Sequence, residues 1–144
     1  MVDAARRDPA AFAQEILRVA TADWLWDLVL ATSGPEDRAL YASSDFAPSF
    51  RRALDEGFAQ GAAGYARDLA LTCGTWPVAP EDVRTPVDLW YGAHDASPVH
   101  SPDHGAMLAA RLPRAARVVE PAAGGALLWT RAADVLAALA RHGA

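Results

Sequence analysis

One carboxylate and three nearby histidines are the residues of this sequence best placed to do chemistry. Asp95 stands three residues after Gly92, beyond the apolar run Val87 to Tyr91, which has the length of a β-strand. A rigid strand that ends in a glycine-opened loop holds a carboxylate well, and open α/β sheets place their sites at that edge. We therefore predict that Asp95 is the main polar group of a site.

The three histidines differ in what they can contribute. His94 is adjacent to Asp95, and its side chain is expected to point elsewhere from a surface loop. His100 lies in the same loop and His104 at the start of the next helix, so either can bring an imidazole base to Asp95. We name His100 as the second catalytic candidate. The alternative is that Asp95 only accepts hydrogen bonds from its own loop.

The same histidines do not form a metal-binding pattern. His100 and His104 are four residues apart, but Ser101 and Pro102 begin a helix between them. One helical face therefore cannot present both imidazoles, and no cysteine joins them as in many zinc sites. We expect no metal and no cofactor.

Large aromatic residues are frequent for a chain of this length. They can pack in a core or an interface, or they can line an apolar pocket between helices and strand ends. Small-molecule sites are mostly apolar with a few polar groups, which Asp95 and His100 can supply. Under this second interpretation the expected ligand-binding residues are Trp24, Tyr65, Trp90, Tyr91 and Trp129.

The length, composition and net charge of the sequence predict one acidic domain spanning residues 1–144. A net charge of −5 argues against nucleic-acid and anionic-membrane partners, which favour a basic surface. No apolar run has the length of a membrane span, and the N-terminus lacks the apolar core of a signal peptide. The single cysteine cannot form an internal disulfide and fits a reducing compartment, so we expect a cytoplasmic protein.

The first half of the chain, about residues 1–75, is predicted to be helical. Asp8 and Pro9 are typical of a helix start, Thr21 caps a second segment, and Pro35 begins another. Glycines then recur on nearly one face of a helical stretch: Gly57, Gly61 and Gly64. Because glycine is costly inside a helix, this spacing predicts either a break or the close approach of another backbone.

The second half, about residues 76–144, alternates strands and helices. The strands are Val87 to Tyr91 and Ala116 to Glu120; a helix begins at Ser101 between them, and a last helix runs from about Thr130 to Arg141. This order predicts an α/β fold with two short parallel strands and flanking helices. Such a sheet has two unpaired edges, so we expect a homodimer through a sheet edge or through the cap-like helices of the first half.

Several features between about residues 50 and 140 follow a recognisable order. A glycine-containing helix at Phe58-Ala-Gln-Gly61 precedes a strand entry at Asp82-Val-Arg-Thr-Pro86, and then the strand and loop Leu89-Trp-Tyr-Gly-x-x-Asp95. The helix His104 to Leu112 and the strand Ala116 to Val119 follow. Together these features resemble the C-terminal part of an α/β-hydrolase. The resemblance implies a truncated α/β-hydrolase-like fold with a cap-derived helical half, in which Asp95 is the triad acid.

Two parts of the family's triad have no counterpart here. No serine lies in the Gly-x-Ser-x-Gly elbow that holds the family's nucleophile, and the chain is expected to begin where the cap would begin. Ala126 occupies the position expected for the triad histidine. The histidine carries the nucleophile's proton, whereas the acid only orients the histidine. The resemblance therefore implies that this chain alone does not perform ordinary triad hydrolysis.

These observations favour a non-hydrolytic function. We expect the chain to bind a small apolar molecule and, if it is an enzyme, to catalyse a rearrangement or cyclisation by holding a reactive conformation. One alternative is the C-terminal fragment of a split or degenerate serine hydrolase of the esterase type, completed by another chain. Another alternative is a non-catalytic interaction protein that binds a partner through the unpaired strand edges.

Overall fold

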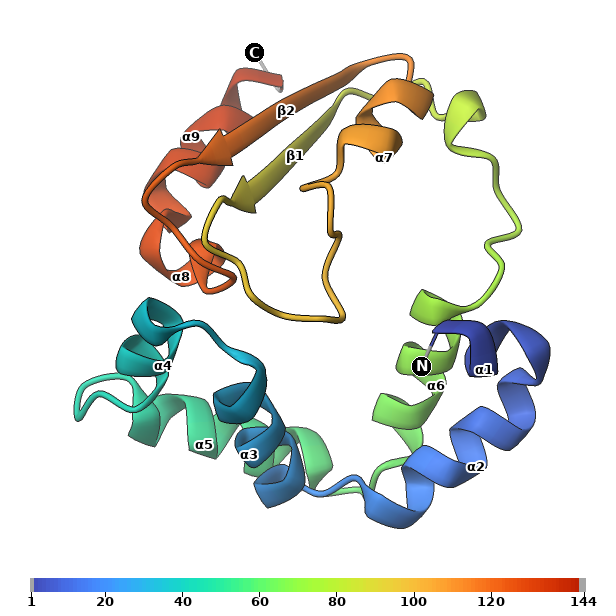
Figure 1. Cartoon of the computed structure of the whole chain (residues 1–144), viewed down its shortest axis with the longest axis vertical. Coiled ribbons are helices and arrows are strands. Elements are labelled where there is room, and N and C mark those ends of the chain that lie inside the picture. The colour runs from blue at the N-terminus through green and yellow to red at the C-terminus, as the bar shows by residue number, and fades with distance from the viewer. Residues whose placement is uncertain (1, 143–144) are drawn as a thin grey trace. The chain divides into compact units, whose positions relative to one another are not determined.

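The chain divides into two compact units in the computed structural model, which describes residues 2–142 (Figure 1). The first unit consists of the residues up to 31 together with 43–77. The second consists of 32–42 together with the residues from 78 onward. The segment 32–42, which the sequence suggested would belong to the helical half, is thus grouped with the strands.

The first unit is helical, as predicted. Its helices are α1 (Val2–Arg7), α2 (Pro9–Val19), α3 (Ala22–Thr32), α5 (Ala47–Phe58) and α6 (Ala63–Cys73). Asp8 caps α2, because its carboxylate accepts the N–H of Ala11 at 2.9 Å. The hydroxyl of Thr21 accepts the N–H of Trp24 at 3.1 Å and caps α3 in the same way. Both predicted helix starts are confirmed.

The core of the first unit lies between α2 and α6. Phe12 and Ile16, four residues apart on one face of α2, are buried, and so is Ala66 on α6. Trp24 and Tyr65 pack around this core and meet edge to face, with ring centroids 6.1 Å apart. Burial of one Phe or Ile side chain contributes about 1.5–3 kcal/mol, so these contacts stabilise the pairing of α2 with α6.

The glycine series marks a break between α5 and α6. Gly61 has a left-handed φ of 85°, which a right-handed helix cannot continue. A Cβ placed on Gly57, Gly61 or Gly64 would have nothing within 4 Å. Of the two interpretations offered by the sequence, the break is confirmed and the close backbone approach is wrong.

The second unit contains the strands. Its elements are α4 (Pro35–Tyr41), a 3-10 turn η1 (Pro80–Asp82), β1 (Val87–Gly92), α7 (Ala106–Arg111), β2 (Ala115–Glu120), α8 (Leu127–Thr130) and α9 (Ala132–His142). β1 and β2 are parallel, with Val87 opposite Ala115 and Gly92 opposite Glu120. This confirms the predicted mixed α/β class with two short parallel strands and flanking helices.

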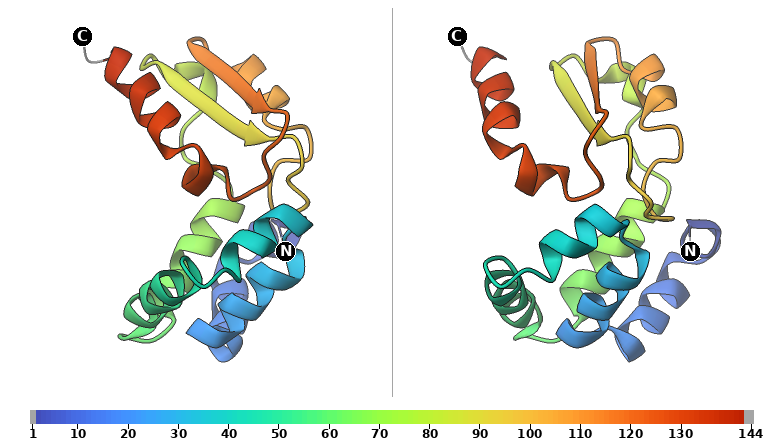
Figure 2. Two further views of the ribbon diagram at one scale, coloured as in Figure 1. Left: turned by 90° about the vertical axis from the view of Figure 1, so that its left-hand side faces the viewer. Right: turned by 60° about the vertical axis from the view of Figure 1, so that its left-hand side comes forward.

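Helices cover both faces of the two-stranded sheet, with α9 on one side and α7 on the other (Figure 2). Side chains alternate along β1, so Asp88 and Trp90 share one face while Tyr91 lies on the opposite face. Asp88 Oδ2 lies 2.9 Å from His142 Nε2, which attaches the last turn of α9 to the strand. Tyr91 packs closely against Gly105, the residue before α7.

The helix between the strands begins later than predicted. His104 and Gly105 have left-handed φ values of 48° and 73°, which delay the right-handed helix to Ala106. Asp103, rather than Ser101, is the main cap: its carboxylate accepts the N–H groups of Gly105 at 3.0 Å and Met107 at 2.8 Å. The hydrogen bond from the Ser101 hydroxyl, at 2.7 Å, lowers the pKa of Asp103, and the bonds from the N–H groups of Met107 and Gly105 lower it further.

Candidate functional site

Asp95 is held at the C-terminal end of β1 by a loop tied to the end of β2. The N–H of Ala93 donates to the carbonyl of Glu120, and the N–H of His94 donates to the carbonyl of Ala123, both at 2.9 Å. A Cβ on Gly92 would overlap the carbonyl of Ala123, so only glycine permits this approach. The tight loop leaves the side chain of Asp95 only 11% exposed. The predicted position of the acid at the strand edge is thus observed.

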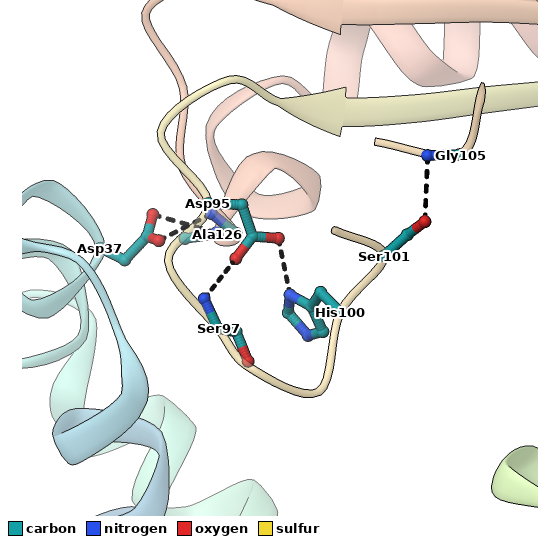
Figure 3. A network of polar contacts seen from close by, with 8 residues as sticks. Asp37, Asp95, Ser97, His100, Ser101, Gly105 and Ala126 are labelled. Atoms are coloured by element: carbon teal, nitrogen blue, oxygen red, sulfur yellow. Dashed lines mark hydrogen bonds and ion pairs between the residues drawn. The ribbon is translucent and has the colours of Figure 1, made fainter. Parts of the chain in front are cut away.

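His100 is the histidine that meets this carboxylate (Figure 3). Its Nδ1 lies 2.6 Å from Asp95 Oδ2, while Asp95 Oδ1 accepts the N–H of Ser97 at 3.0 Å. When a neutral imidazole donates its Nδ1–H to the carboxylate, its Nε2 carries the lone pair. The His100 side chain is half exposed, and its Nε2 makes no hydrogen bond with the residues that the structure describes. Both predicted catalytic candidates therefore lie in direct contact.

A second carboxylate, that of Asp37, binds the turn that lies against Asp95. Asp37, on α4, is only 5% exposed, and it accepts the N–H of Gly125 at 2.7 Å and that of Ala126 at 3.0 Å. A Cβ on Gly125 would lie 2.9 Å from Asp95 Oδ1, so the same turn also touches Asp95. In the sequence Asp37 stands two residues after Pro35, where an acid in the first turn of a helix is common. No local pattern marks its second role, because its partners come from the other end of the chain.

Tyr41 and Trp129 complete the surroundings of these carboxylates. The indole N–H of Trp129 donates to the hydroxyl of Tyr41. Burial raises the pKa of Tyr41, and the negative charges of Asp37 and Asp95 raise it further, which outweighs the opposing effect of the Trp129 hydrogen bond. Tyr41 is therefore a neutral phenol at physiological pH. Trp129, which we expected to contact ligand, thus has a hydrogen-bonding role beside the site.

The other histidines are directed elsewhere. His94 Nδ1 lies 3.4 Å from Glu36 Oε1, and both side chains are more than half exposed. This agrees with the expectation that His94 points away from Asp95. His104 packs its ring edge to face with Tyr91, with the ring centroids 6.5 Å apart. Of the candidate bases, only His100 contacts Asp95.

The predicted ligand-binding aromatics are distributed over several places. Trp24 and Tyr65 contact each other within the first unit. In the second unit Trp90 and Tyr91 lie on opposite faces of β1, so they do not line the same side of the sheet. The indole nitrogen of Trp90 is buried without a hydrogen-bond partner in the described part of the chain.

An apolar groove begins at Ser101, directly after His100 in the chain. Its volume is about 280 Å³, close to the lower limit of about 300 Å³ for small-molecule pockets. Its lining is Ser101, Pro102, Asp103, Met107, Leu108 and Arg111. Met107 is 74% exposed there. Apart from the Asp103 cap and Arg111, which pairs with Glu81 at 2.6 Å, the groove offers mainly carbon atoms.

Comparison with family models, with curated proteins and with solved structures gives no match to this chain. Within residues 2–142, no helix combines the length and apolar character that a membrane span requires. No group of three or more His, Cys, Asp or Glu side chains in the same residues is arranged to hold a metal ion.

Proposed function

We propose that this chain binds a small apolar molecule and catalyses its rearrangement or cyclisation by removing a proton from one atom of the molecule and returning it to another. His100 is the base, and Asp95 is the carboxylate that orients it. The observation that carries the proposal is the 2.6 Å contact between Asp95 Oδ2 and His100 Nδ1. An imidazole held in this way has one tautomer, and its Nε2 can accept a proton from a substrate and return it.

Several features favour a non-hydrolytic reaction. Ala126, not a histidine, is the last residue of the turn that touches Asp95, and the sequence contains no nucleophile elbow. The N–H groups of Gly125 and Ala126 both donate to Asp37, so neither serves as an oxyanion donor. A proton-transfer reaction needs neither a covalent nucleophile nor that donor pair. We further propose that the fold is a truncated α/β-hydrolase in which His100 has replaced the base lost at Ala126.

The groove that begins at Ser101, the residue after His100, favours an apolar and uncharged ligand. Met107 and Leu108 supply apolar surface, and the carboxylate of Asp103, which belongs to the lining, repels an anion. Arg111, the cation of the groove, is already paired with Glu81 through two hydrogen bonds. A small ketone or unsaturated compound with an acidic C–H bond matches this combination of surface and base.

The test is proton exchange catalysed by the full chain in D₂O. A panel of small apolar ketones and dienes is incubated with the protein, and mass spectrometry follows deuterium uptake and the appearance of isomers. We expect at least one compound to take up deuterium or to isomerise without gaining the mass of water. His100→Gln should reduce the rate by about 10²–10⁴-fold, the usual contribution of a general base.

The matched control is His94→Gln, which changes a histidine of the same loop that pairs with Glu36 instead of Asp95. This variant should retain the wild-type rate. The proposal is wrong if His100→Gln is as active as wild type. A product that has gained one water would instead indicate a hydrolase.

A further inference from the structure

The turn from Ala123 to Ala126 lies between two carboxylates (Figure 3). On one side Asp37 accepts the N–H groups of Gly125 and Ala126. On the other side Asp95 touches Gly125, whose Cβ, if present, would lie 2.9–3.2 Å from the Asp95 carboxyl group. The position of Asp95 therefore depends on where this turn is held.

Asp37 is suited to hold the turn because its carboxylate is almost fully buried and both of its oxygens accept a hydrogen bond. A buried carboxylate needs such partners, and hydrogen bonds to a charged acceptor are the stronger ones. Because Gly124 has no side chain, the carboxylate of Asp37 can lie directly against the turn. A Cβ at Gly124 would overlap that carboxylate. The arrangement thus fixes α4 and the turn together.

We propose that Asp37 is a positioning residue for the Asp95–His100 pair. By fixing the turn it sets the surface against which Asp95 rests, and so it keeps Asp95 Oδ2 directed at His100 Nδ1. Asp37 itself does not contact the imidazole and takes no part in proton transfer. This inference rests on the function proposed above, because positioning has a purpose only if His100 acts as a base.

The substitution Asp37→Asn tests this role with little change of shape. Asparagine offers one oxygen acceptor, and its NH₂ group faces the remaining backbone N–H as a second donor. One of the two bonds to the turn is therefore lost. The matched control is Glu36→Gln, because Glu36 is the neighbouring acid on α4 and contacts exposed His94 rather than the turn.

The measurement is nuclear magnetic resonance of ¹⁵N-labelled histidine, which requires no substrate. In wild type we expect His100 as the Nδ1–H tautomer, with a downfield Nδ1–H proton from its short bond to Asp95. Asp37→Asn should give a mixture of tautomers and lose that proton signal while circular dichroism remains native. Glu36→Gln should leave the spectrum unchanged. Folded Asp37→Asn protein with the wild-type His100 spectrum would overturn the proposal.

The wild-type spectrum separates this proposal from the function on which it rests. If wild-type His100 is not the Nδ1–H tautomer, the proposed base itself is wrong. If the wild type has that tautomer and Asp37→Asn retains it, only the positioning role fails. With a substrate in hand, Asp37→Asn should lower kcat at unchanged KM.

A second variant covers the case in which Asp37→Asn does not fold. Ala126→Pro removes the N–H that donates to Asp37 Oδ1, and the φ of Ala126, −75°, suits proline. The same loss of the single tautomer is expected, and an unchanged spectrum overturns the proposal. If neither variant folds, the wild-type protein provides the test. Scalar couplings are then measured across the hydrogen bonds from the N–H groups of Gly125 and Ala126 to the carboxylate carbon of Asp37. Their absence overturns the proposal.

Discussion

The carboxylate of Asp37 occupies the space that a side chain on Gly124 would need. A Cβ built on Gly124 overlaps both carboxylate oxygens of Asp37. The turn can therefore approach α4 only because it carries glycine at this position. The first unit contains the opposite case at Gly57, which lies in α5 with nothing within 4 Å of an added Cβ.

The two glycines should respond in opposite directions to the same substitution. Gly124→Ala should lower the free energy of unfolding by about 1–3 kcal/mol, the usual cost of overpacking a filled site. Gly57→Ala should raise it by up to about 1 kcal/mol, because alanine is the better helix former. Urea unfolding of both variants measures the difference. Equal effects would contradict the placement of Asp37 over the turn.

The raised pKa of Tyr41 predicts a loss of stability at alkaline pH. An unfolded tyrosine ionises near pH 10, whereas burial and the two nearby carboxylates raise the pKa of folded Tyr41 above that value. Its contribution is therefore fully present below pH 10 and is lost as the pH rises from 10 toward the folded pKa. Tyr41→Phe should flatten this alkaline decline in thermal melts. The same decline in both proteins would refute the assignment.

The second unit combines exposed apolar residues on α8 and α9 with a sheet of two strands. Within the described residues β1 and β2 pair only with each other. The side chains in question are Leu128, Trp129, Leu136 and Leu139, each more than half exposed. Unpaired strand edges and an apolar helix face together favour self-association. We expect a two-fold dimer formed through this part of the second unit.

Sedimentation velocity at micromolar concentration tests the dimer. Leu136→Glu should shift the protein to monomer, since it places a charge on the proposed interface. Leu71→Glu is the control, because Leu71 is 61% exposed but lies on α6 in the first unit. A monomeric wild type would show that the dimer does not form. Equal effects of the two substitutions would place the interface elsewhere.

The sequence predicted features that depend on residues close together in the chain. The strands follow from short apolar runs, and the helix starts at Asp8 and Thr21 follow from side chains that bond N–H groups three residues ahead. Asp95 and His100 lie five residues apart in one loop, so their pairing needed only a loop that turns back on itself. The truncated hydrolase-like fold and the small-molecule function remain predictions.

What the sequence could not predict depends on partners far along the chain. By residue type and position, Asp37 is an acid in the first turn of a helix and Tyr41 is an aromatic residue near its end, and neither pattern indicates a site. Their roles come from Gly125, Ala126 and Trp129, which no spacing rule connects to α4. Likewise, the delayed start of α7 follows from the left-handed backbone at His104, an unusual conformation for that residue.

The grouping of residues 32–42 with the strands has a consequence for folding during synthesis. The hydrogen bond between Asp37 and Gly125 joins residues 88 positions apart, so α4 leaves the ribosome long before the turn that it binds. Until then the carboxylate of Asp37, which is buried in the folded chain, lacks the backbone N–H groups of the turn, and long-range contacts of this kind form slowly. The site around Asp95 can therefore mature only after the turn has been made, and a chain that stops before Gly125 lacks the groups that bind Asp37.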